Sequence, residues 1–118
     1  MNTAANVVVL LVALLHAYFL VLEMFLWDKP AGLKAFGQTL EAAKASKVLA
    51  ANQGLYNGFL SAGLVWGLYL GDAGRPVKTF FLVCVVVAGL YGAATASKKI
   101  LFIQALPAAL ALALVWLA

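Results

Sequence analysis

The stretch NQGLYNG, Asn52 to Gly58, places three amides and a tyrosine inside an otherwise apolar part of the chain. Its two glycines, Gly54 and Gly58, are four positions apart and therefore share one side of a helix. This spacing predicts a small-residue face that lets a second helix approach closely. The polar side chains of the stretch are assigned to the opposite arc of the same helix: Asn52, Gln53, Tyr56 and Asn57.

The composition of the chain indicates an integral membrane protein. Of its 118 residues, 66% are hydrophobic and 10% are charged, and the mean hydropathy is +1.04. A water-soluble core of this size cannot cover so much apolar surface. The net charge of +4 comes from basic residues in short gaps between apolar runs, where they indicate membrane topology. We therefore predict no nucleic-acid partner.

The predicted fold is all-α, an integral membrane four-helix bundle in a single domain. Apolar runs close to the length that a bilayer requires define its helices. Their expected ranges are about residues 7–27, 38–70, 77–96 and 100–117. Pro30 and Gly32 are expected to end the first helix. Because residues 38–47 contain good helix formers and no breaker, the second helix is predicted to extend into the cytoplasm.

The lysines and arginine in the predicted loops give the orientation, because short basic loops stay in the cytoplasm. The first and third loops carry six lysines: Lys29, Lys34, Lys44, Lys47, Lys98 and Lys99. The second loop carries only Arg75 and Lys78. Both termini are therefore predicted to be extracellular or periplasmic. Apolar residues at helical spacing beside the first-loop lysines suit an interfacial helix, but a solvated helical collar with no ligand is the favoured interpretation.

The intramembrane polar side chains gather in one predicted layer. At about 1.5 Å per residue, Glu23, Asn52, Gln53 and Gln104 fall about 6 to 8 Å below the cytoplasmic boundary. The outer halves of the helices offer almost no polar lining, so a continuous aqueous pore is not expected. We predict a ligand site that opens toward the cytoplasm. Its candidate residues are His16, Glu23, Asn52, Gln53, Tyr56, Asn57, Tyr91 and Gln104.

Each of these residues also has a structural interpretation. Amides in membrane bundles often hydrogen-bond neighbouring helices together. An ionised Glu23 would be costly in a bilayer unless it is protonated, hydrogen-bonded or wet. His16 is the only histidine and Cys84 the only cysteine, so neither a metal site nor an internal disulfide is predicted. No cofactor is predicted either.

Three segments carry a resemblance to a known family: His16–Trp27 (HAYFLVLEMFLW), Asn52–Leu64 (NQGLYNGFLSAGL) and Ala88–Leu112 (AGLYGAATASKKILFIQALPAALAL). They are similar to the signature segments of small bacterial membrane proteins known as domain-of-unknown-function family thirteen-oh-four. The resemblance covers nearly the whole chain and implies four transmembrane helices in the bacterial cytoplasmic (inner) membrane. It implies no activity, substrate or catalytic residue.

A second resemblance, at the level of architecture, is to the membrane-associated eicosanoid and glutathione metabolism proteins. Those proteins carry Arg, Glu and Pro where Val48, Leu55 and Gly58 stand here. The resemblance therefore does not support a glutathione thiolate site. What it implies is a homo-oligomer, with a trimer as the expected form.

Three functions stay open at the level of sequence. The first is binding of a small molecule or lipid, which the polar cluster favours because no nucleophile, metal set or phosphate loop accompanies it. The second is a glutathione-related membrane enzyme in which Glu23 and His16 serve as acid and base. The third is a small proton-coupled transporter that uses Glu23.

Overall fold

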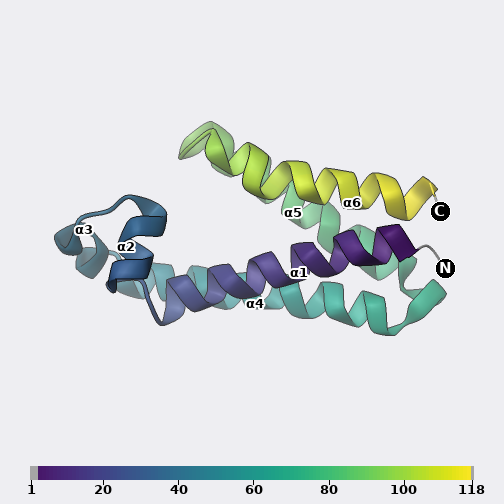
Figure 1. The fold of residues 1–118 in the computed structure, drawn as a ribbon, viewed down its shortest axis with the longest axis horizontal. Helices are drawn as coiled ribbons and strands as arrows, with labels where there is room; N and C mark the ends of the chain where they lie inside the picture. The colour runs from purple at the N-terminus through teal and green to yellow at the C-terminus, as the bar shows by residue number, and fades with distance from the viewer. Residues whose placement is uncertain (1–2, 118) are drawn as a thin grey trace. The chain divides into compact units, whose positions relative to one another are not determined.

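The computed structural model describes residues 3–117, and every regular element in that range is helical. The longer helices are α1 (Thr3–Met24), α4 (Lys47–Tyr69), α5 (Arg75–Thr95) and α6 (Leu106–Leu117) (Figure 1). The shorter ones are α2 (Pro30–Phe36), α3 (Leu40–Ala45), the 3₁₀ turn η1 (Gly71–Gly74) and the π-helical turn η2 (Leu101–Ala105). The all-α prediction is confirmed for the described residues.

The chain divides into two compact units that cut across its helices. The first, named here the core unit, contains the described residues of 3–14 and 60–117. The second, the collar unit, is Leu15–Phe59. Each of α1 and α4 contributes one part to each unit. The site residues predicted from the sequence are therefore distributed between two units, which are described separately.

The core unit packs small and branched side chains from several helices. Val9 of α1, Leu64 of α4 and Leu82 of α5 are fully buried in one cluster with Ala108 of α6. Gly89 allows α5 to approach η2 closely, since a Cβ atom there would lie 2.6 Å from the backbone nitrogen of Ala105. Such close approach through small residues is the packing mode expected of membrane helices.

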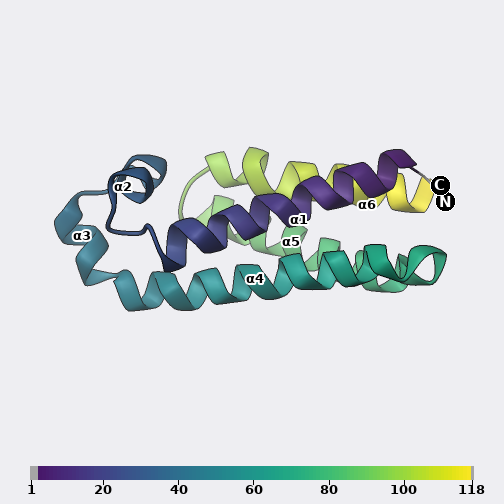
Figure 2. The ribbon, with the colours of Figure 1, turned by 60° about the horizontal axis from the view of Figure 1, so that its bottom comes forward.

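In the collar unit, the second part of α1 and the first part of α4 run side by side in opposite directions (Figures 1 and 2). The short helices α2 and α3 connect them. Gly32 fixes α2 against the end of α1, because a Cβ atom at this position would lie 2.0 Å from the Leu26 carbonyl oxygen. At the other end of α2, Gly37 adopts the left-handed conformation (φ 61°) that favours glycine.

Two predictions for the first loop are wrong. The expected continuous helix over residues 38–70 is two helices, α3 and α4, separated at Ser46. The Ser46 hydroxyl donates to the Ala42 carbonyl (2.9 Å) and the residue has φ −108° and ψ 10°, outside the helical region. Pro30, interpreted as a helix breaker, instead begins α2, since proline in a first turn sacrifices no intrahelical hydrogen bond.

The second loop is shorter than its charges suggested. Gly71 turns the chain with φ 64°, and α5 already begins at Arg75. Lys78 therefore lies inside α5, where it is buried and donates from Nζ to Asn6 Oδ1 at 3.3 Å. Counting it as a loop residue was wrong. Without Lys78, the predicted second loop has only Arg75 as a basic residue, so its difference in basic charge from the first and third loops is larger.

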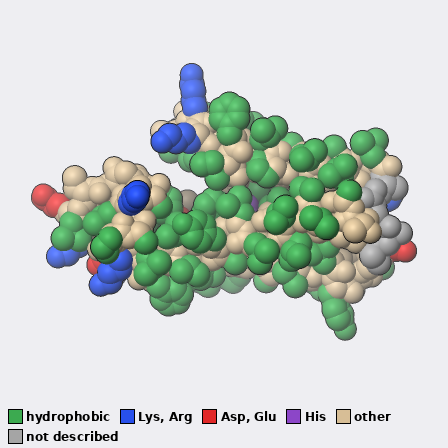
Figure 3. Space-filling model, viewed as in Figure 1, with side chains coloured by type: hydrophobic (Ala, Val, Ile, Leu, Met, Phe, Trp, Pro, Cys, Tyr) green, Lys and Arg blue, Asp and Glu red, His purple; other side chains and the backbone are tan. Residues whose placement is uncertain are grey.

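Two helical segments are long and apolar enough to cross a membrane, Thr3–Met24 and Gly71–Thr95, with hydropathies of 2.5 and 2.0. The apolar helix Leu101–Leu117 is shorter, and α4 does not meet the same criterion although it has 23 residues. Large hydrophobic side chains are exposed on all of these helices, and Figure 3 shows them along α1 and α6. Exposure on this scale is typical of a membrane or partner-contacting surface.

Candidate functional site

The glycines of the NQGLYNG stretch set the contact between α1 and α4 in the collar unit. A Cβ atom at Gly54 would lie 2.6 Å from Met24 Cγ and 3.1 Å from Glu23 Cβ. A Cβ atom at Gly58 would lie 2.7 Å from Leu20 Cδ1. The two positions are therefore filled by α1, and larger side chains there would force the helices apart.

This close contact brings the carboxyl group of Glu23 to α4. The Asn57 amide donates from Nδ2 to Glu23 Oε1. Glu23 is only 6% exposed, so the hydrogen bond satisfies a carboxyl oxygen that the neighbouring helices cover. Burying a carboxyl group without such a donor is costly. The pair therefore stabilises the α1–α4 contact.

Asn57 thus lies on the packing side of α4, and its assignment to the arc opposite the glycines is wrong. At 100° per residue, a side chain three positions after Gly54 lies about 60° from it around the helix. Gly54, Asn57 and Gly58 form one stripe at i, i+3 and i+4, the spacing of a helix-packing face. The helical geometry of the sequence could have given this result.

The remaining polar residues of the stretch form a second surface, named here the outer face: Asn52, Gln53 and Tyr56. All three are exposed, Tyr56 by 60%. Within residues 3–117, the structure shows no hydrogen bond from the side-chain amides of Asn52 and Gln53. The Tyr56 ring lies near that of Phe59, with centroids 6.2 Å apart. The outer face therefore carries amide and phenol groups whose hydrogen-bonding capacity is open.

His16 is fully buried and lies two turns before Glu23 on α1. Its ring meets that of Phe19 edge to face, with centroids 5.5 Å apart. It therefore belongs to the packed interior, where an aromatic contact orients the imidazole.

The last two candidate residues, Tyr91 and Gln104, belong to the core unit. Tyr91 of α5 is 72% exposed, and Gln104 lies partly buried in η2. Their participation in a site with Glu23 and Asn52 stays a prediction.

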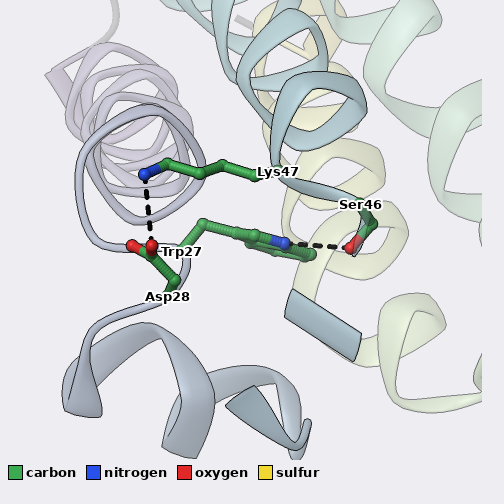
Figure 4. A network of polar contacts seen from close by, with 4 residues as sticks. All are labelled: Trp27, Asp28, Ser46 and Lys47. Carbon is green, nitrogen blue, oxygen red and sulfur yellow. Dashed lines mark hydrogen bonds and ion pairs between the residues drawn. The ribbon is translucent and has the colours of Figure 1, made fainter. Parts of the chain in front are cut away.

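A polar junction that the sequence analysis did not single out joins the residues that follow α1 to the start of α4 (Figure 4). Trp27 Nε1 donates to Ser46 Oγ at 3.1 Å, and Lys47 Nζ donates to Asp28 Oδ2 at the same distance. This hydrogen bond from Lys47 lowers the pKa of Asp28 below its ordinary value of 3.8. The two pairs join residues 27 and 28 to residues 46 and 47. They therefore link the two ends of the segment that contains α2 and α3.

Among residues 3–117, no group of three or more His, Cys, Asp and Glu side chains could hold a metal ion. Cys84 is a partly buried free thiol on α5.

Residues 10–116 match the model of a family described as a protein of unknown function (DUF1304). The chain belongs to this family. It is also 34% identical over 105 residues to the uncharacterized protein YpaA of Lactococcus lactis subsp. lactis (strain IL1403), covering 87% of this chain and 88% of YpaA. No solved structure matches the chain. The family and this relative establish to which proteins the chain is related, and neither description names a function.

Proposed function

We propose that this family member is a multi-pass protein of the bacterial inner membrane that binds an amphipathic small molecule or lipid on the outer face of α4. In this proposal Asn52, Gln53 and Tyr56 supply the hydrogen bonds to the polar part of the ligand. The apolar side chains beside them, Leu55 and Phe59, contact its hydrocarbon part. Both are exposed on the same helix.

The observation that carries the proposal is the contrast between the amides of one helix. Asn57 is paired with Glu23, whereas Asn52 and Gln53 are exposed and make no side-chain hydrogen bond within the described residues. An amide that faces hydrocarbon without a partner costs several kcal/mol, about 4 to 8 on the cyclohexane scale. Headgroup, ester or other polar atoms of a bound molecule would remove that cost.

The position of the outer face along α4 supports a ligand that sits near the membrane surface. Asn52 follows Lys47, the first residue of α4, by five positions, which corresponds to about 7.5 Å along a helix axis. Tyr56 lies one further turn along. A phenol and amides at this depth suit the boundary between lipid headgroups and acyl chains, where amphipathic aromatic residues are enriched.

In this proposal Glu23 positions α4 beside α1, and it transfers no proton. Its carboxyl group is covered and accepts a hydrogen bond from Asn57, and Gly54 packs against its Cβ atom. These contacts hold α4 so that the outer face points away from α1. The enzyme and transporter functions would instead require a carboxyl group that reaches a substrate.

Native mass spectrometry of the full-length protein tests the proposal. The wild type, purified in a mild detergent, should retain lipid or small-molecule adducts from the host membrane, and the double variant N52L/Q53L should lose most of them. A second variant, L55A, trims the apolar part of the proposed site and should keep the adducts at reduced occupancy. Unchanged adducts in N52L/Q53L would overturn the proposal. So would a change of oligomeric state without loss of adducts, which would assign the outer face to contact between copies of the chain.

A further inference from the structure

The segment that links α1 to α4 has an excess of exposed positive charge. Lys29, Lys34 and Lys44 are exposed and form no ion pair within the described residues. Lys47 is occupied by Asp28, which leaves Glu41 as the other acid of the segment. Figure 3 shows the charged side chains gathered over α2 and α3, beside apolar atoms of the same segment.

The same short helices expose apolar side chains. Phe36 at the end of α2 is 40% exposed and Leu40 at the start of α3 is 46% exposed. Segments that rest in the headgroup region of a bilayer typically combine exposed hydrophobic side chains with lysines, whose apolar stems lie beside those side chains. A segment surrounded by water would not gain from exposing these residues.

The chain keeps these helices close to the membrane surface. The candidate span Thr3–Met24 ends six residues before Pro30, and six extended residues reach at most about 20 Å. The distance between the end of this span and α2 is shorter than that limit, because at Gly32 the helix packs directly on the Leu26 and Trp27 carbonyl oxygens. The Trp27 ring also packs against that of Phe36, with centroids 4.8 Å apart and ring planes tilted by 49°.

We propose that α2 and α3 form a docking surface for the anionic phospholipid headgroups of the membrane that α1 enters, with Lys29, Lys34 and Lys44 contacting the phosphates. Phe36 and Leu40 enter the region of the glycerol esters. Charge complementarity selects this partner, because each lysine near an anionic leaflet gains attraction that a zwitterionic leaflet does not provide. The surface is separate from the outer face of α4, and its lysines contribute nothing to the hydrogen bonds proposed there.

Trp27 provides an internal probe of this surface. In the full-length W66F/W116F variant it is the only tryptophan. The variant is placed in nanodiscs that contain equal mole fractions of phosphatidylglycerol and phosphatidylcholine, with bromine on the acyl chains of one lipid or the other. Bromine quenches tryptophan fluorescence at short range. The ratio of quenching by the two brominated lipids therefore reports which lipid is enriched near Trp27 in the collar unit.

The proposal predicts that brominated phosphatidylglycerol quenches Trp27 at least about twofold more strongly than brominated phosphatidylcholine. The added substitutions K29Q/K34Q/K44Q should bring the ratio close to one, whereas the matched control K98Q/K99Q, which alters lysines of the core unit, should leave it unchanged. Circular dichroism confirms that each variant keeps its helices. Equal quenching by both lipids in the W66F/W116F parent would overturn the proposal, as would a preference that survives K29Q/K34Q/K44Q or disappears equally in both lysine variants.

Discussion

The two faces of the first part of α4 carry the same kinds of side chain and have different surroundings. On one face, Asn57 hydrogen-bonds Glu23 between two glycines that touch α1. On the other face, Asn52 and Gln53 are exposed. Asparagine therefore has two different environments in one helix, five positions apart. The comparison teaches that an amide in an apolar helix is paired when a small-residue stripe brings a second helix to it, and stays exposed when no helix covers it.

The largest effect should come from filling the packing face. Gly54→Leu places a side chain where a Cβ atom alone would already lie 2.6 Å from Met24 Cγ. Overpacking of this kind costs about 1 to 3 kcal/mol, and we expect the upper end because the Glu23–Asn57 pair is also pushed apart. Reversible unfolding of the protein in mixed micelles measures the loss. The matched control Gln53→Leu, on the outer face, should change stability by no more than about 0.5 kcal/mol.

The next largest effect should come from the amide that partners Glu23. Asn57→Leu leaves a covered carboxyl group without its donor and should cost about 1 to 2 kcal/mol. Asn52→Leu removes the same amide from the outer face and should be nearly neutral for stability. A double-mutant cycle with Glu23→Gln isolates the pair, and a coupling energy near zero between positions 23 and 57 would contradict the structural role of the bond.

A smaller effect is expected at the junction that begins α4. Ser46→Ala removes the acceptor of Trp27 Nε1 and the donor to the Ala42 carbonyl. Loss of partly exposed hydrogen bonds of this kind should cost about 1 kcal/mol. Trp27 fluorescence should change at the same time, since its indole nitrogen loses a partner. An unaltered emission spectrum in the W66F/W116F background would show that the junction does not form.

The smallest effect should come from the pH dependence of the exposed Asp28–Lys47 pair. Because the pKa of Asp28 is lower in the folded protein than its ordinary 3.8, the pair stabilises the fold fully above that value. The stabilisation is lost as the pH falls through the lowered pKa. Asp28→Asn should therefore reduce stability slightly at neutral pH and make no difference in strong acid, as unfolding at both pH values can establish. An equal loss at both would contradict the ion pair.

Much of this organisation could be predicted from the sequence, and the exceptions have physical causes. Hydropathy gives the bounds of α1 and α5 within about four residues at each end. It did not give the break at Ser46, where the hydroxyl donates to the Ala42 carbonyl and accepts a hydrogen bond from Trp27, a residue distant in sequence. Pro30 was interpreted as a breaker although proline also begins helices. Whether Tyr91 and Gln104 join the site depends on packing between helices, which no local pattern determines.

The side-chain amide signals of Asn52, Gln53 and Asn57 test the central claim most directly. In the full-length protein in micelles, selective nitrogen-15 labelling resolves these groups by NMR, and phosphatidylglycerol, as the probe amphiphile, is titrated in. We predict that the Asn52 and Gln53 amide signals shift with saturation while the Asn57 signal stays in place, because its amide is already bound to Glu23. A shift of the Asn57 signal with Asn52 and Gln53 unmoved would contradict the division of α4 into a packing face and a binding face.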